Sequence, residues 1–451
     1  MPFLSDRTRR LWRIRTRRGA LGQWPILKRR IATAAGAVLL GLVALAFARA
    51  SDLAQELFGH AVARWPYAPL VATPLAFAAI VWATRRWAPA ARGSGIPQVI
   101  AAGQATDRMA AQRMLSLGTA AKKLVLTVGM LLFGASVGRE GPSVQVSAAI
   151  MVALHRVLRV PVTAGVLIAG GAAGVAAAFN TPLAGVAFAI EELAAAYEQR
   201  VAILVMGAVM IAGMVSLGVA GDYVYFGAVH QTLRFHRVLL LAPLAGVLGG
   251  IAGGLFTRSV LGFSDGRIGW ARALKARPVL FAGLCGVVVA VLGVVTHGAT
   301  WGTGYGATRT LVEGGALSGW FGPAKLVATL ATTLTGAPGG IFAPSLAIGA
   351  GFGNLLTALF PYSPPGAVVV IGMVAYFVGV VRAPFTAVII VSETTAARGL
   401  ILPMFAAALI ADWVSAQVCR ERLYHGLARP FVAETNAAPP TAPAQSSSSS
   451  S

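Results

Sequence analysis

The chain has 451 residues, of which 57% are hydrophobic and 12% are charged, against about 25% charged in ordinary soluble domains. With 53 glycines and a mean hydropathy of +0.73, this composition excludes a soluble globular domain and indicates a polytopic membrane protein. The net charge of +22 is concentrated before the first apolar run. Basic residues there fit the positive-inside rule better than nucleic-acid binding, so we expect a cytoplasmic N-terminus.

In chain order, we expect four segments: a basic cytoplasmic N-terminal segment (1–30), a first membrane repeat (31–220), a second (221–434) and a disordered C-terminal tail (435–451). Several apolar runs approach the roughly 20 residues that span a bilayer; they are Ile31–Ala48, Val201–Leu217, Val238–Phe256 and Val279–Val295. Others are short or broken, namely Val144–Leu154, Val162–Ala178 and Val368–Val381. Broken helices at membrane depth pack within protein or line a cavity, which predicts an internal site.

Cysteine and histidine give no sign of a metal site. Cys285 and Cys419 lie in apolar surroundings, so we expect no disulfide framework, no metal and no cofactor. We interpret the histidines as loop or interface residues; they are His60, His155, His230, His236, His297 and His425. We expect no signal peptide and no soluble regulatory module after the membrane part.

The sequence repeats weakly at a constant shift of 202 residues. Lys123-Leu124-Val125 returns as Lys325-Leu326-Val327. The same shift pairs Gly134 with Gly336, Gly138 with Gly340, Pro142 with Pro344, Gly170 with Gly372, Pro182 with Pro384 and Glu191 with Glu393. Two membrane repeats with broken helices at matching places are the plan by which transporters build a central site.

Glu140 is an acidic residue in the apolar run Gly138-Arg139-Glu140-Gly141-Pro142. A carboxylate at membrane depth is costly and is a functional-site hypothesis by default. Glycine and proline beside it let a helix begin there, with free N–H groups that can face an anion. Its repeat partner is Phe342, so we predict two half-helices that start opposite one another, with Glu140 as a gate on an anion path.

Four segments carry a family resemblance. They are Gly93-Ser94-Gly95-Ile96-Pro97, Gly138 to Pro142, Gly339-Gly340-Ile341-Phe342-Ala343-Pro344 and Leu423-Tyr424-His425. They resemble the GSGIP, GREGP and GxFxP signatures and the late tyrosine of the CLC family of chloride channels and proton-coupled chloride transporters, over roughly Arg30 to Phe431. The resemblance implies an all-α fold of two inverted-topology repeats with re-entrant helices. It also implies a pore in each subunit of a homodimer, in a bacterial inner membrane with both termini cytoplasmic, as in members without attached CBS domains.

An anion site follows from the same resemblance. It implies that chloride binds between the hydroxyls of Ser94 and Tyr424 and the backbone N–H groups of Ile341 and Phe342, where partial positive charges converge without a full charge that would trap the ion. Nitrate-preferring members tend to have proline at the position of Ser94, and fluoride exporters a different residue, so chloride is the expected ion.

Other residues would support this site. Arg139 and Lys123 would raise the local potential without contacting the ion. The motif glycines belong to the surrounding loops; they are Gly93, Gly95, Gly138, Gly141 and Gly340. Gln98 departs from bacterial relatives that often have an acidic residue after the GSGIP proline, which bears on vestibule charge.

The resemblance also implies a proton route. Glu140 matches the external gating glutamate of the family, and Glu192 matches the internal proton-transfer glutamate that its exchangers typically carry. We therefore predict H⁺/Cl⁻ exchange. An alternative reading makes Glu192 a solvated residue at a helix end, paired with Arg200. Glu191 and Glu393 are interpreted as structural.

Rival functions remain at this stage. One is a passive, voltage- or pH-gated chloride channel of the same fold. Another is an intramembrane serine hydrolase, because Gly134-Ala135-Ser136-Val137-Gly138 fits G-x-S-x-G. No histidine stands in a context suited to a general base, so we expect no enzyme. A third is a membrane scaffold without transport, which would leave Glu140 and the repeat unexplained.

Overall fold

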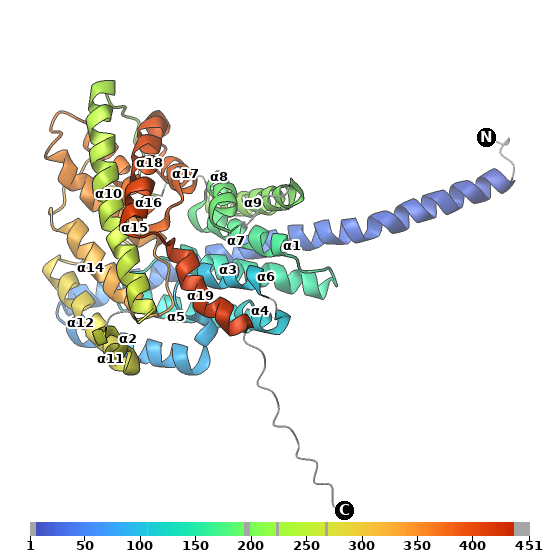
Figure 1. Ribbon diagram of the computed structural model, residues 1–451, viewed down its shortest axis with the longest axis horizontal. Coiled ribbons are helices and arrows are strands. Elements are labelled where there is room, and N and C mark those ends of the chain that lie inside the picture. Colours follow the sequence, from blue (N-terminus) through green and yellow to red (C-terminus); the bar gives the residue numbers. More distant parts are fainter. Residues whose placement is uncertain (1–5, 106, 194–198, 222–224, 267–268, 437–451) are drawn as a thin grey trace, which may run out of the picture.

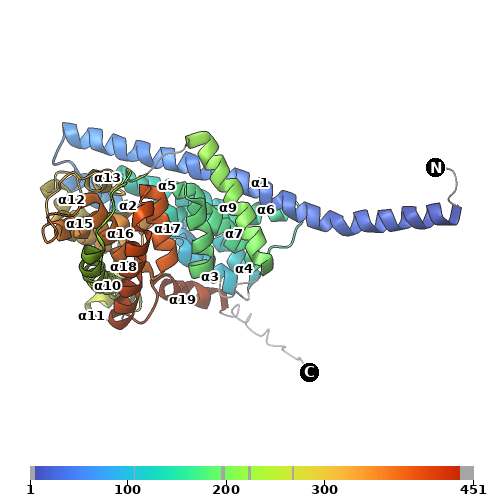
Figure 2. The ribbon, with the colours of Figure 1, turned by 90° about the horizontal axis from the view of Figure 1, so that it is seen from above.

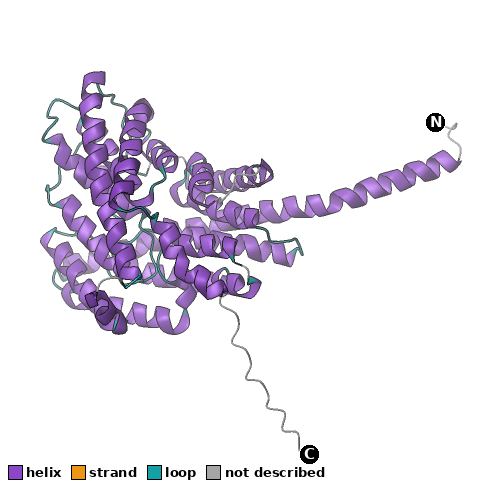
Figure 3. Ribbon diagram, viewed as in Figure 1, coloured by secondary structure: helices purple, strands orange, loops and turns teal. Residues whose placement is uncertain are grey.

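The computed structural model describes residues 6–105, 107–193, 199–221, 225–266 and 269–436. Within these ranges the secondary structure is helical and no strand element occurs (Figure 3). The predicted all-α class is confirmed. The predicted tail lies outside the described ranges except for residues 435 and 436, which end the last helix.

The first repeat contains nine α-helices and two short turns of other helix types. They are α1 (Asp6–Arg64), α2 (Pro69–Trp87), η1 (Pro89–Ala91), α3 (Ile96–Gln104), α4 (Arg108–Met114), α5 (Leu117–Leu132), α6 (Glu140–Val157), α7 (Ala164–Phe179), α8 (Pro182–Phe188), η2 (Ala189–Leu193) and α9 (Gln199–Ala220). The second repeat follows as α10 (Phe235–Ser264), α11 (Gly269–Ala276), α12 (Pro278–Val295), α13 (Tyr305–Val312), α14 (Phe321–Leu334), α15 (Phe342–Thr357), α16 (Pro365–Val381), α17 (Pro384–Thr395), η3 (Arg398–Leu400), α18 (Ile401–Val418) and α19 (Leu423–Asn436).

Among the described residues, six helices are long and apolar enough to cross a membrane. The four predicted spans fall within α1, α9, α10 and α12, and two more spans cover Met109–Leu132 and Arg398–Val418. Two of the predicted broken runs fall within α6 and α16, and the third, Val162–Ala178, begins two residues before α7. Helix α1 continues without interruption through residue 30, so the basic segment differs from the membrane part in composition rather than by a break in structure. Its N-terminal part projects beyond the helical body (Figures 1 and 2).

The two repeats have the same packing plan. Helix α1 packs against α7 and α9 in the first repeat, and α10 packs against α16 and α18 in the second. The backbone repeats as well. Gly134 and Gly336 have φ of 76° and 71°, and Asn180 and Arg382 have φ of 56° and 60°, each pair 202 residues apart. These matching left-handed residues end the same helices in both halves, which confirms the duplication in the structure.

The repeats meet where α6 and α15 begin. Gly138 and Gly340 exchange two backbone hydrogen bonds, each with an N···O distance of 2.7 Å, in an antiparallel bridge. Helix α6 starts two residues after Gly138, and α15 starts two residues after Gly340. The prediction that Glu140 and Phe342 begin opposing half-helices is therefore correct, and the N-terminal ends of both helices lie at the contact between the repeats.

Candidate functional site: a polar centre between two broken-helix repeats

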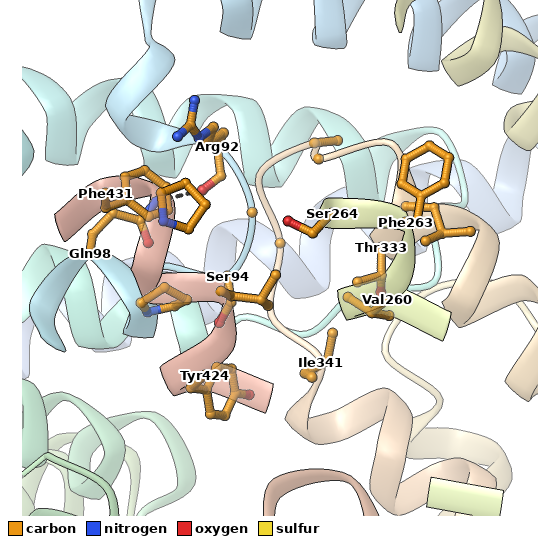
Figure 4. A pocket seen from close by; sticks show the side chains of 18 of the residues that line it. Arg92, Ser94, Gln98, Val260, Phe263, Ser264, Thr333, Ile341, Tyr424 and Phe431 are labelled. Carbon is orange, nitrogen blue, oxygen red and sulfur yellow. Dashed lines mark hydrogen bonds between the residues drawn. The ribbon is translucent and has the colours of Figure 1, made fainter. Parts of the chain in front are cut away.

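Three predicted anion-binding residues line one cavity of about 440 Å³. Ser94 comes from the loop before α3, Ile341 precedes the first residue of α15, and Tyr424 lies in the first turn of α19 (Figure 4). The hydroxyls of Ser94 and Tyr424 are buried and have no hydrogen-bond partner in the described part of the chain. A buried hydroxyl without a partner is unfavourable unless a ligand or water completes it. The geometry therefore leaves two polar groups ready for an anion.

The Ser94 loop is held from two sides. Lys123, fully buried on α5, donates its ammonium protons to the carbonyls of Ala91 and Gly93, the former at 2.8 Å. The Gln98 amide donates to the carbonyl of Arg92 at 2.6 Å. These contacts assign Lys123 and Gln98 to positioning the loop, and Lys123 places its charge one residue from Ser94.

The predicted motif glycines allow the close approach of these segments. A Cβ atom at Gly141 would clash with the Ser94 hydroxyl oxygen, and one at Gly340 would lie 2.9 Å from the backbone N of Gly141. A Cβ atom at Gly138 would clash with the Glu140 carboxylate. Larger residues would thus fill the space where Ser94 and Glu140 meet the two helix ends.

Phe342 is fully buried and surrounded by other aromatic rings. Its ring lies 5.0 Å from that of Phe377, 5.7 Å from Phe188 and 5.9 Å from Tyr424, measured between centroids. This packing fixes the start of α15, where the first N–H groups have no partner within the helix. The aromatic rings also make the surroundings apolar, which strengthens electrostatic interactions at the helix end.

Glu140 is fully buried and its carboxylate lies at the N-terminus of α15 rather than in a vestibule. Oε2 accepts a hydrogen bond from the backbone N of Ala343 at 3.4 Å, and Oε1 accepts one from the Tyr305 hydroxyl. The carboxylate therefore occupies a position suited to an anion. Sequence reasoning missed Tyr305. The run Gly302-Thr303-Gly304-Tyr305 matches Gly93-Ser94-Gly95-Ile96 at a distance of 209 residues. This match is not visible at the shift of 202 residues that relates the other repeated positions.

Arg139 points away from the Ser94 cavity. Its guanidinium donates to Asp52 Oδ1 and to the carbonyl of Ala48, both at 2.8 Å, and to the Tyr225 hydroxyl at 2.6 Å. Arg139, Asp52, Tyr225 and Tyr305 line a second cavity of about 640 Å³. Glu140 therefore lies between two cavities, and Arg139 contributes positive potential on the side opposite Ser94.

Glu192 is buried in the η2 turn, with a relative exposure of 2%. The alternative reading as a solvated helix-end residue is therefore wrong, and the side chain of Arg200 lies outside what the structure describes. Nδ1 of His425 lies 3.4 Å from Oε1 of Glu192. His425 thus departs from the interpretation of the histidines as loop or interface residues. The sequence signal was its position directly after Tyr424.

Glu191 and Glu393 have the structural role that was predicted for them. Glu191 accepts hydrogen bonds from the backbone N of Phe385 and Thr386 at the start of α17, at 3.0 and 2.7 Å. Glu393 accepts from Leu183 and Ala184 at the start of α8, at 3.4 and 3.0 Å. Each repeat therefore caps a helix of the other.

The structure gives no support to a serine hydrolase. Ser136 is fully buried, and its hydroxyl lies 2.8 Å from that of Thr329. Since Thr329 donates to the carbonyl of Lys325, Ser136 is the donor of this pair and lacks an activating base there. The described residues also contain no group of three metal-ligating side chains.

The fold consists of two inverted repeats, and a half-helix of each repeat starts at a buried polar centre between two cavities. This arrangement defines a membrane protein of the transporter and channel class. The chain belongs to the CLC family: the family model described as "Voltage gated chloride channel" matches residues 75–416. The resemblance inferred from the motifs is thereby confirmed.

Similar proteins include both relatives and solved structures. The "H(+)/Cl(-) exchange transporter ClcA" of Yersinia pestis bv. Antiqua (strain Angola) is 30% identical over 435 residues, covering 90% of this chain and 88% of the relative. The protein of the same name from Salmonella agona (strain SL483) is 30% identical over 388 residues, covering 81% and 80%. A slow cyanobacterial Cl⁻/H⁺ antiporter matches in structure with a TM-score of 0.77 and 22% identity, covering 91% of this chain and 99% of that one. A CLC-type fluoride/proton antiporter matches with a TM-score of 0.75 and 21% identity, covering 87% and 96%.

Proposed function

We propose that this protein exchanges chloride for protons across a membrane, with Glu140 as the group that both ions compete for. The observation that carries the proposal is the position of the Glu140 carboxylate at the start of α15, where it accepts a hydrogen bond from the backbone N of Ala343. A helix N-terminus favours an anion, and a protonated carboxyl loses that attraction. The names of the relatives support the same function.

The exchange can be described by the residues that face each cavity. Ionised Glu140 blocks the passage between the Tyr305 cavity and the Ser94 cavity. When Glu140 takes up a proton, it leaves the end of α15, and chloride replaces it between Ser94, Tyr424 and the N–H groups of Ile341 and Phe342. Proton transfer between Glu140 and Glu192 then returns the gate to its ionised form. Several weak contacts hold the ion, which permits rapid release.

The direct test measures chloride and proton movement together in liposomes that contain the purified protein. A chloride gradient should drive proton uptake against the proton gradient. Glu140→Gln and Glu192→Gln should each abolish proton movement, because a glutamine side chain does not titrate, while chloride still crosses. Chloride flux without proton movement in the unmodified protein would establish the passive channel instead.

We further propose how the molecule lies in the bilayer. The Ser94 cavity faces the cytoplasm together with both termini, since Arg85 and Arg86 end α2 just before the Ser94 loop, and basic residues concentrate on the cytoplasmic side. The assembly is a homodimer in the bacterial inner membrane, and this part rests on the family resemblance. Light scattering of the detergent-solubilised protein measures its oligomeric state, and labelling of a cysteine added at residue 2 in intact cells tests the orientation.

A further inference from the structure

Glu192 lies deep in the protein without a hydrogen bond from the described residues. Its side chain is fully buried, and neither carboxylate oxygen accepts a hydrogen bond from the described residues. A buried carboxylate without donors is strongly disfavoured in its ionised form. If Glu192 carries protons, a neighbouring group must deliver them from water.

Within the described part of the chain, the imidazole of His425 connects Glu192 to solvent. Its Nδ1 lies 3.4 Å from Oε1 of Glu192, yet 45% of its side chain is exposed. It lines a cavity of about 280 Å³ together with Ile100, Gln104, Ala428, Arg429, Val432 and Ala433. Among these lining residues, His425 is the one that carries an imidazole, the side chain that often serves as a proton shuttle in proteins.

Helix α19 separates this cavity from the one that contains Ser94. Tyr424, Leu427, Phe431 and Glu434 line the Ser94 cavity, at spacings of three and four residues. The residues of α19 that line the smaller cavity follow these by one position or more, and the two cavities have no lining residue in common. Residues three and four apart share one face of a helix, so two faces of α19 serve two different openings.

We infer that His425 takes up protons in the smaller cavity and passes them to Glu192. The inference rests on the proposed exchange function. In the transfer, the imidazolium gives its Nδ1 proton to the Glu192 carboxylate, which leaves a neutral imidazole and a neutral carboxylic acid. A hydronium ion from the cavity then protonates the imidazole again, and outward movement reverses these steps.

The charged groups around His425 fit this role. Arg422 donates to the carbonyl of Glu191 at 3.3 Å, and Arg429 pairs with Glu421 at 2.9 Å. Guanidinium groups keep their protons in proteins, so neither arginine can substitute for the imidazole as a carrier. Arg422 lies beside the route as a fixed positive charge that favours the carboxylate form of Glu192, whereas the charge of Arg429 is paired with that of Glu421.

The test uses the full-length protein in liposomes. His425→Ala should lower proton flux at least tenfold at pH 7 while chloride flux stays within twofold, which changes the ratio of the two ions. Added imidazole should restore proton flux in His425→Ala but not in Glu192→Gln, because a small base can replace the missing ring but not the carboxylate. His425→Gln should behave like His425→Ala, and His236→Ala at the exposed start of α10 is the matched control.

Several outcomes would overturn the inference. One is an unchanged ratio of protons to chloride in both His425 variants while Glu192→Gln loses proton flux. Another is a parallel fall of both fluxes that imidazole does not restore, which would show a structural role. The absence of proton flux in the unmodified protein would instead refute the exchange function on which the inference rests.

Discussion

The loops at Gly93–Gly95 and Gly302–Gly304 have the same backbone and different chemistry. The glycines have φ of 63° and 110° in the first loop, and 65° and 86° in the second. A helix begins directly after each loop, α3 after Gly95 and α13 after Gly304. Each is held by a fully buried lysine of its own repeat, Lys123 at 2.8 Å from Ala91 O and Lys325 at 2.8 Å from Gly302 O.

The side chains on the two loops have diverged. Ser94 has no hydrogen-bond partner among the described residues, whereas the hydroxyl of Thr303, its counterpart, donates to Oε1 of Gln55 at 3.0 Å. The second loop instead places Tyr305 against Glu140. One duplicated scaffold therefore presents, at one cavity, a hydroxyl without a hydrogen-bond partner among the described residues, and at the other a tyrosine that donates to the Glu140 carboxylate.

Removing either loop lysine should have the largest effect, because the two loops depend on the same support. Lys123→Met leaves the carbonyl of Ala91 without its donor, whereas that of Gly93 still accepts from the backbone N of Gly339. Lys325→Met leaves the carbonyls of Thr300 and Gly302 without their lysine donor, and each stranded oxygen costs about 1–3 kcal/mol. Both variants should unfold at clearly lower temperature in detergent. Lys122→Met is the control, since exposed Lys122 donates to the carbonyl of Trp87. A lower unfolding temperature in only one of these two lysine variants would show that the two loops do not depend equally on their lysines.

The next largest effect should separate Ser94 from Thr303. Ser94→Ala removes a hydrogen bond to a charged ligand, worth about 1.5 kcal/mol or more, so chloride affinity should fall about tenfold. Thr303→Val should keep the affinity and lower protein stability by about 1 kcal/mol, because it loses only the contact with Gln55. Calorimetric titration with chloride measures the first effect. Equal losses of affinity in both variants would show that the loops had not diverged.

Tyr305→Phe should have a moderate effect on transport rate. Without the hydroxyl, the Glu140 carboxylate leaves the start of α15 more readily, and we expect chloride turnover to rise about three- to tenfold, as the loss of one charge-assisted hydrogen bond implies. Proton coupling should persist, since the variant retains the carboxyl group of Glu140. Tyr362→Phe, at an exposed tyrosine, is the control. Slower turnover in Tyr305→Phe would mean that the hydroxyl assists the ion rather than the closed gate.

The smallest effect is expected at Lys275, which lines the Ser94 cavity outside the predicted spans. Partial burial lowers the pKa of its ammonium group, so its charge, present below that pKa, is lost at a lower pH than in an exposed lysine. Lys275→Gln should slow chloride entry about twofold at low ionic strength and less at 0.5 M salt, where charges are screened. A salt-independent effect would argue against electrostatic attraction of chloride into this cavity.

The sequence allowed the fold and most of the centre to be predicted, because these features depend on local patterns. The shift of 202 residues placed Glu140 opposite Phe342, and the resemblance to the CLC family motifs supplied Ser94, Ile341 and Tyr424 as neighbours. Tyr305 was not predictable at that shift, because the segment between it and Lys325 is shorter than the matching segment between Ile96 and Lys123. The contact between His425 and Glu192 was hidden for another reason: it joins two turns far apart in the chain.

The carboxylates of Glu191 and Glu393 have a consequence for the origin of the molecule. Glu191 contacts Phe385 and Thr386, and Glu393 contacts Leu183 and Ala184; all three pairs of positions are 202 residues apart. Each half thus uses its glutamate to cap a helix of the other half. Such reciprocal contacts characterise an isologous interface between identical subunits. The two caps thus preserve, inside one chain, the two-fold interface of an ancestor that was half as long and paired with itself.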